Sequence, residues 1–224
     1  MKIMNVVVSE ELHSKCPDFC GCMILADIIN SEYDSRLWAE IQDEIESFRN
    51  RYDTESIKLI SGIAATRKAY KECGKDPSRY RPSNEQLVRR VLQGKDLYQI
   101  NTVVDLVNLA SIRYGYSIGG FDFDKVEGEM VVLGIGKEGE PYEGIGRGPL
   151  NIAGMPVYRD NAGGIGTPTS DHERTKLSLA TTHFLAFVNG YDGNRAHTSD
   201  CANFIAQLLA KYAKAQNIVI QEFR

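Results

Sequence analysis

Residues 81–124 constrain the fold most, because they join two helical patterns, a glycine corner and a strand with almost no spare residues. The first helix should begin at Ser83, in a capping box with Gln86, and end at Gly94, a residue that tolerates the left-handed conformation. Its apolar face is formed by Leu87, Val88, Val91 and Leu92, and its opposite face by Arg89, Arg90 and Gln93. This pattern predicts a core helix with a basic outer face.

The second helical pattern is apolar around almost its whole circumference, which indicates burial on most sides. Asp105 and Asn108 interrupt it, and each needs a partner, since an unpartnered buried polar group costs roughly 1–3 kcal/mol. We expect Asp105 to form a capping box with Thr102. Asn108 has no such local partner, and two alternatives stay open for it: a hydrogen bond to a neighbouring loop backbone, or a side chain that faces a ligand pocket.

Hydrophobic patterns along the rest of the chain predict a mixture of strands and helices. The predicted strands are residues 3–8, 20–29, 121–123, 129–135, 156–158, 183–188 and an edge strand at 218–220. Further helices are predicted from about Asp34 onward and over residues 63–73 and 199–213. The strands fall into two groups rather than alternating with helices, which predicts an α+β fold, a layered sandwich of mixed or antiparallel sheets with helices.

The length of 224 residues suits one large domain or at most two small ones. No apolar run approaches the length of a membrane span, and the run after Met1 is too short for a secretory signal. We therefore expect a cytoplasmic protein without a membrane partner.

An odd number of cysteines in a chain without a signal favours reduced thiols. They are Cys16, Cys20, Cys22, Cys73 and Cys201. With His13, three of them suggest a zinc site, but Cys20 and Cys22 alternate on one face of a predicted strand and no second ligand pair follows. We expect no metal and no cofactor, and no nucleophilic cysteine, because Cys73 and Cys201 lack a nearby histidine or acid.

The run GIGKEG at residues 134–139 fits the dinucleotide pattern GxGxxG. That pattern needs a helix whose N-terminus receives the pyrophosphate, whereas Glu140 and Pro141 follow here. We therefore expect a hairpin with a glycine turn and no nucleotide binding.

The net charge of −4 argues against nucleic acid, but residues 67–95 contain nine Lys and Arg against three Asp and Glu, a local balance of +6. Such a patch can contact RNA phosphates in a salt-dependent way. The candidate RNA-binding residues are Arg67, Lys71, Arg79, Arg81, Arg89 and Arg90. A solvated helix face explains the same charges, so both interpretations stay open.

The order of VRR, a short glycine-containing linker, INTVVDLVNL and GGFDFD resembles the B3/B4 domain of the phenylalanyl-tRNA synthetase beta subunit. The run ATRKAYKECGKDPSRYRPS resembles freestanding B3/B4-domain proteins. The resemblance implies one B3/B4-like domain over residues 1–224, with residues 1–55 as an N-terminal flank and 56–224 as the core. It also implies that tRNA or aminoacyl-tRNA is the partner, rather than DNA, and that misacylated tRNA is edited. Without motifs of a class II synthetase, the chain should not aminoacylate tRNA alone.

The resemblance also implies a substrate pocket. Asn108 matches an asparagine of the synthetase editing pocket, whereas Gly119 stands where the synthetase has a histidine, and the Gly163-Gly164 loop lacks its glutamate. A tyrosine-selective site is therefore not expected, and any ligand should be different or larger. The candidate substrate-binding residues are Asn108, Gly119, Gly120, Gly163, Gly164, Asp171 and Arg174.

Residues 159–175 form a loop dense in glycine and small polar residues, of the kind that lines binding sites. Adjacent Ser170, Asp171 and His172 do not make a triad, because successive side chains diverge. We expect a buried Asp171–Arg174 ion pair instead, and no catalytic residue is assigned. Three functions stay open: a trans-acting aminoacyl-tRNA deacylase in which Asn108 orients the substrate, a noncatalytic RNA-binding module, and an amino-acid or small-molecule binding protein.

Overall fold

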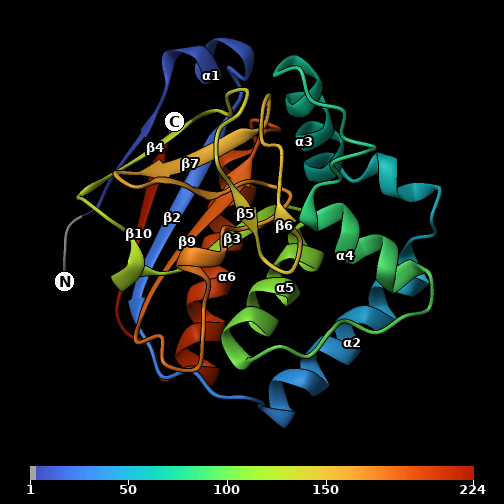
Figure 1. Cartoon of the computed structure of the whole chain (residues 1–224). Coiled ribbons are helices and arrows are strands. Elements are labelled where there is room, and N and C mark those ends of the chain that lie inside the picture. Colours follow the sequence, from blue (N-terminus) through green and yellow to red (C-terminus); the bar gives the residue numbers. More distant parts are fainter. Residues whose placement is uncertain (1–3) are drawn as a thin grey trace.

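A computed structural model describes residues 4–224 of the chain (Figure 1). The helices are α1 (Glu10–Lys15), α2 (Ser35–Arg51), α3 (Ser61–Glu72), α4 (Ser83–Leu92), α5 (Thr102–Tyr114) and α6 (Arg195–Tyr212), with 3₁₀ turns η1 (Ser56–Leu59), η2 (Phe123–Lys125) and η3 (Glu173–Thr175). The strands are β1 (Asn5–Val8), β2 (Cys20–Asp27), β3 (Ser117–Asp122), β4 (Met130–Ile135), β5 (Glu143–Gly144), β6 (Gly148–Pro149), β7 (Pro156–Asp160), β8 (Gly163–Gly166), β9 (His183–Gly190) and β10 (Gln216–Phe223). The strand predicted at 3–8 starts at Ile3, which lies outside the described residues.

The strands form two four-stranded sheets and a separate two-stranded hairpin of β5 and β6. The first sheet has the order β1-β4-β7-β8, with β1 and β4 parallel and the other neighbours antiparallel. The second sheet, β10-β2-β9-β3, is antiparallel throughout. The predicted α+β sandwich of mixed and antiparallel sheets is therefore confirmed.

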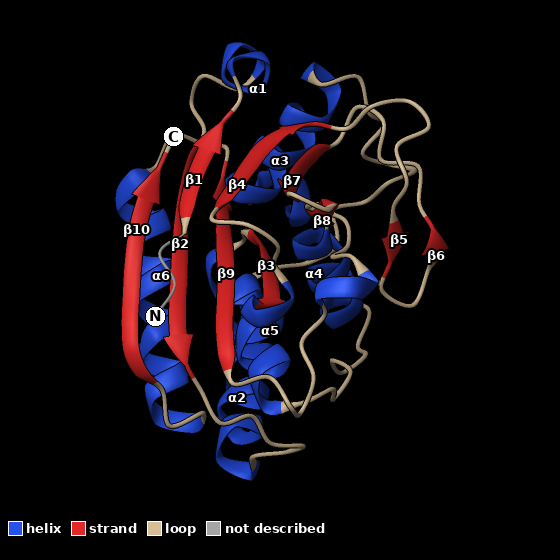
Figure 2. Ribbon diagram, turned by 60° about the vertical axis from the view of Figure 1, so that its left-hand side comes forward, coloured by secondary structure: helices blue, strands red, loops and turns tan. Residues whose placement is uncertain are grey.

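Strand β2 shows how the layers are built, because successive side chains of a strand point to opposite faces. Ile24 and Ala26 lie in a buried cluster with apolar residues of α2, α4, α5 and α6. Met23 and Leu25 lie in a second cluster together with Tyr158 and other residues of the first sheet. The second sheet is thus the middle layer, and Figure 2 shows its four strands side by side with α5 and α6 behind them. The predicted N-terminal flank contributes β2, which lies between β10 and β9.

The two central helices form where predicted, but both capping predictions were wrong. Pro82 takes the N-cap position of α4, so Ser83 is its first helical residue, and the Gln86 side chain donates to the Arg81 carbonyl at 2.7 Å. Helix α5 is capped by Asn101, whose side chain accepts from the Val104 N–H at 3.0 Å, as helix-capping asparagines commonly do.

Asp105 does not bond to Thr102 as predicted. Its carboxylate accepts from the Ile100 N–H at 3.0 Å and from the Trp38 indole N–H at 2.9 Å. The Thr102 hydroxyl instead lies 2.7 Å from that of Ser31. Burial raises the pKa of Asp105 despite these hydrogen bonds. Asp105 is therefore a structural residue that joins the start of α5 to α2.

Other element boundaries differ from the sequence patterns. Strand β3 begins at Ser117, earlier than predicted, since the Gly119-Gly120 pair hid its continuity from a propensity argument. The GIGKEG run is followed by a turn and by β5 rather than by a helix, and β4 pairs with the distant β7, so the predicted local hairpin was wrong. Within residues 4–224, no helix is long and apolar enough to cross a membrane.

Candidate ligand-binding cleft

A cleft with two compartments lies between α5, β3 and the chain around Asp171. The larger compartment has a volume of about 420 Å³ and is mainly apolar, lined by Ile100, Val104, Val107, Ile118, Ile145 and Leu177. The smaller has a volume of about 140 Å³ and is bordered by four hydroxyl residues, Ser83, Ser111, Thr167 and Ser170. The last three donate to backbone carbonyls of the protein. Both are bordered by Val107, Asn108, Ile118 and Asp171, so they adjoin each other. The combined size is in the range of small-molecule sites.

Secondary-structure periodicity brings the lining residues together. Val104, Val107 and Asn108 are spaced three and four residues apart on α5, which places them on one helix face. Ile118 and Gly120 alternate along β3, the edge strand of its sheet. The β5–β6 hairpin supplies Ile145. This hairpin is joined to α4 by a 2.6 Å hydrogen bond from the Arg147 guanidinium to the Gln86 side chain.

Asn108 lies at the boundary of the two compartments and is half-buried. Its side chain forms no hydrogen bond with residues 4–224, unlike Asn101 seven residues earlier, which caps α5. Of the two alternatives left open by the sequence, the side chain has the pocket-facing position. The role of Asn108 in binding stays a prediction.

Asp171 borders both compartments from the opposite wall. Its Oδ2 accepts from the backbone N–H of Gly120 at 3.0 Å. Its Oδ1 lies close to two positions that only glycine can occupy, Gly119 and Gly166. A Cβ atom at either position would be 3.1 Å from Oδ1 and less than 3 Å from the Phe121 ring. Burial raises the pKa of Asp171 to about 7, opposed by the Gly120 hydrogen bond. This is an acid that titrates near neutrality inside a cleft.

The predicted ion pair between Asp171 and Arg174 was wrong. The Arg174 guanidinium binds Asp160 at 2.8 and 3.0 Å and donates to the Lys125 carbonyl. The 3₁₀ turn η3 begins two residues after Asp171, with His172 as its N-cap, and places Arg174 at the end of β7. Arg174 therefore holds the β7–β8 connection and does not line the cleft.

The predicted glycines divide between the cleft and its surroundings. Gly120 lines the larger compartment, and Gly119 makes room for Asp171. Gly163 and Gly164 belong to β8 and do not line either compartment; Gly164 lies against the Tyr142 ring. Within the same glycine-rich segment, it is Gly166 that lies against Asp171.

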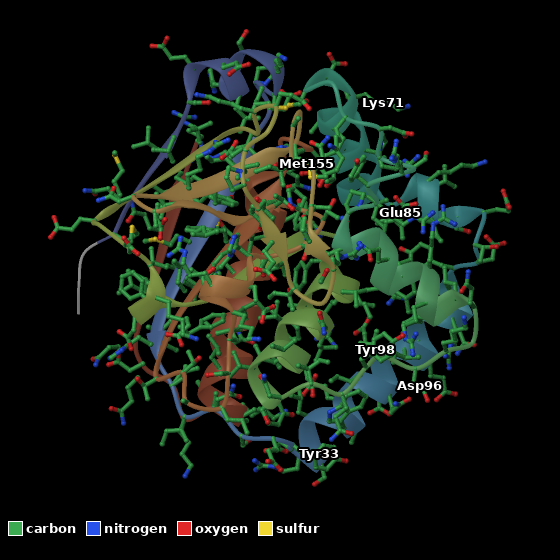
Figure 3. All side chains as sticks on the ribbon, in the orientation of Figure 1. Tyr33, Lys71, Glu85, Asp96, Tyr98 and Met155 are labelled. Carbon is green, nitrogen blue, oxygen red and sulfur yellow. The ribbon has the colours of Figure 1, made fainter. Side chains whose placement is uncertain are left out.

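Three of the candidate RNA-binding residues converge on one buried carboxylate. Glu85, with a side chain only 1% exposed, lies 2.8 Å from both Arg67 and Arg89 and 3.5 Å from Arg81. Figure 3 labels Glu85 on α4. The cluster is still positive, with three cations for one anion, but its arginines are held in place by the protein.

The other three candidate RNA-binding residues are less constrained. Arg90 stacks over the exposed ring of Tyr98 at 3.7 Å and donates to the Asp96 carbonyl. Arg79 lies over the Tyr80 ring at 5.5 Å. Lys71 is exposed near the end of α3. Guanidinium–aromatic stacks of this kind keep a charged, planar surface at the solvent boundary.

The five cysteines are buried free thiols. Cys20 and Cys22 lie on one face of β2, as predicted from their alternation, and contact Thr198 and Ser199 of α6. Burial raises the pKa of both thiols, that of Cys22 to about 11, which makes them poor nucleophiles. Within residues 4–224, no three His, Cys, Asp or Glu side chains are placed to hold a metal ion.

Three comparisons relate this chain to known proteins. The B3/4 domain family model matches residues 65–214. The phenylalanine–tRNA ligase beta subunit of Desulfotalea psychrophila is 25% identical over 143 residues, which cover 62% of this chain and 16% of that protein. An N-terminal fragment of the phenylalanyl-tRNA synthetase beta subunit from Pyrococcus horikoshii has a TM-score of 0.51 and 12% identity, covering 99% of this chain and 54% of the fragment. This chain thus spans only a small part of its curated relative, and the structural likeness is one of fold.

Proposed function

The chain belongs to the B3/4 domain family, and on that premise we propose that its cleft receives the aminoacylated end of a tRNA and promotes hydrolysis of the ester. The observation that carries the proposal is the two-compartment cleft with Asn108 and Asp171 at its junction. The apolar compartment suits an amino-acid side chain, and the smaller compartment, where the Ser83 hydroxyl has no partner among the described residues, suits the terminal ribose.

Hydrolysis requires a water molecule to attack the ester carbonyl, with release of the free amino acid and of the ribose hydroxyl. Donors must face the oxygen that becomes negative during attack. The Asn108 amide is one candidate. A second candidate is the Ile118 N–H. In an antiparallel pair, the N–H groups of alternate residues point away from the partner strand, which for β3 is β9. The Gly120 N–H points away from β9 towards Asp171, so the Ile118 N–H, two residues earlier, points to the same side. The Gly120 N–H already donates to Asp171, so it is not a third candidate donor to the oxyanion.

The position of α4 supports a tRNA substrate. Ser83 and Leu87 of this helix line the smaller compartment, while Arg89 and Arg90 follow on the same helix. Phosphates bound along the arginines would therefore lead the 3′ end of the RNA into the cleft. Phosphate contacts position a nucleic acid without reading its sequence, which suits a site that acts on the attached amino acid.

The test is a panel of aminoacyl-tRNAs, each carrying a correct or incorrect amino acid, incubated with the wild type and with Asn108→Ala. Loss of one donor to a developing oxyanion should slow hydrolysis by about 100-fold or more. Asn203→Ala, which removes an exposed asparagine of α6, is the matched control and should retain the full rate. If no aminoacyl-tRNA is deacylated above background, the enzyme proposal fails.

One observation favours a second function, the binding of a free amino acid or another small molecule. Glu85 engages three of the arginines, which leaves fewer free guanidinium groups to contact phosphates than the sequence suggested. Binding of uncharged tRNA at increasing salt distinguishes the two. For a tRNA-binding protein, Arg90→Ala and Lys71→Ala should each lower the salt slope by about one. No binding at low salt would favour the small-molecule function.

A further inference from the structure

Asp171, half-buried at the cleft, differs from the buried carboxylates of residues 4–224 in the partners of its carboxyl group. Glu85 binds three arginines, Glu44 binds two, and Asp160 binds Arg174 and three backbone N–H groups. Asp105 has two donors, and Asp122 binds Lys125, the Thr181 hydroxyl and the Asp124 N–H. Asp171 has one hydrogen bond, from Gly120, and no cationic partner within the described chain. A carboxylate that has lost much of its hydration without gaining such partners is costly, which indicates that a partner is supplied from outside.

The charged and titratable groups around Asp171 do not supply that partner. Burial above all, and the nearby Asp171 carboxylate as well, raise the pKa of the Tyr142 and Tyr158 phenols, so both phenols stay neutral. Lys176 lines the larger compartment, but it forms an ion pair with Glu173. His172 stacks edge-on against Tyr142 and accepts from the Arg174 N–H.

The free oxygen of Asp171, Oδ1, lies against the backbones of Gly119 and Gly166 and beside the Phe121 ring, while Asp171 borders both compartments. Neither Gly119 nor Gly166 tolerates a side chain there, because a Cβ at either position would meet both Oδ1 and the Phe121 ring. Across the junction, the Asn108 amide is also without a partner among the described residues. The Asp171 carboxylate and the Asn108 amide thus border the same two compartments, of which the larger is mainly apolar.

We propose that Asp171 binds a primary ammonium group of the ligand, so that the cleft selects aminoacyl compounds with a free α-amino group over their N-acylated forms. An ammonium offers three donors and a full positive charge, which lets it bind Asp171 and the Asn108 carbonyl together. The apolar compartment beside them then receives the ligand's side chain. This inference deepens the proposed function, because it assigns the end of the aminoacyl group that the cleft recognises.

The experiment measures binding of RNA-free probes by calorimetry at neutral pH. The probes are L-leucinamide, L-phenylalaninamide and the N-acetyl form of each. The wild type should bind the free amines at least about tenfold more tightly than the acetylated forms, as expected for a charge-assisted hydrogen bond. Asp171→Asn, which keeps the shape of the side chain, should abolish this preference. Asp200→Asn, at an exposed carboxylate of α6, should preserve it.

Equal binding of amine and acetylated probes, retained preference in Asp171→Asn, or no binding of either amine would each overturn the inference. If Asp171→Asn does not fold, Asp171→Ser gives the same comparison. The probes contain no RNA and no ester, so amine selectivity without tRNA deacylation would refute the proposed function alone. Equal deacylation of aminoacyl-tRNA and N-acetyl-aminoacyl-tRNA would refute the ammonium site alone.

Discussion

Replacement of Asp171 by asparagine should stabilise the protein at alkaline pH and have much less effect in acid. In the folded protein, burial raises the pKa of this carboxyl to about 7, against an ordinary value of 3.8. The folded state therefore keeps a proton that the unfolded chain releases between these two values. As pH rises through this window, the unfolded state gains relative stability, and the contribution of Asp171 to folding is lost.

The magnitude follows from the separation of the two pKa values. At about 1.4 kcal/mol per pKa unit, full burial corresponds to an upper limit of about 4 kcal/mol. Asp171 retains partial exposure as a residue at the edge of the cleft, so solvent screens part of its charge. Between about pH 4 and about pH 8, the free energy of unfolding of Asp171→Asn should therefore rise by about 2 kcal/mol relative to that of the wild type.

Urea unfolding monitored by circular dichroism at intervals over this pH range measures the effect. The informative quantity is the difference between variant and wild type, because other groups that titrate in both proteins cancel. Asp200→Asn controls for loss of an exposed carboxylate, and its difference curve should be nearly flat. A flat curve for Asp171→Asn as well, or one that falls as pH rises, would refute the assignment of a raised pKa to Asp171.

Three further substitutions test the surrounding structure. Gly136→Ala should lower the free energy of unfolding by at least about 2 kcal/mol, because its Cβ would lie 2.0 Å from the Ile152 carbonyl oxygen; an unchanged urea midpoint would contradict this packing. Asn101→Ala removes the N-cap of α5 and should cost about 1 kcal/mol, measured as a lower melting temperature, whereas Asn203→Ala should have little effect. Glu85→Gln leaves three arginines facing one another and should cost roughly 2 kcal/mol, less at high salt; a loss independent of salt would count against repulsion as the cause.

The hydrophobic periodicity of the sequence was enough to locate most helices and strands. The alternation of Cys20 and Cys22 correctly placed both thiols on one face of β2, and Asp34 caps α2 as its position suggested. Caps were less predictable, because several polar residues near a helix start compete for the same N–H groups. At α5, Asn101 rather than Thr102 takes that position.

The sequence predicted only some of the residues that form the candidate site. Asn108 stood out as a polar interruption of an apolar helix, and it lies in the cleft. The charge of Arg174 and its closeness in sequence suggested an ion pair with Asp171. The η3 turn instead directs the Arg174 side chain to Asp160. The free oxygen of Asp171 depends on Gly119 and Gly166, which are 47 residues apart in the chain.

The sequence by itself determined the α+β class, the central helix–helix–strand unit and membership of the B3/4 family, since each depends on short-range periodicity or on a local run of residues. Only the tertiary structure decided which distant segments meet. It inserts β2 between β10 and β9, brings Asp171 to Gly120 across 51 residues, and turns a basic stretch into an arginine cluster around Glu85. The physical reason is that these contacts arise from sheet pairing and layer stacking, which minimise exposed apolar surface over the whole chain and leave no local signature.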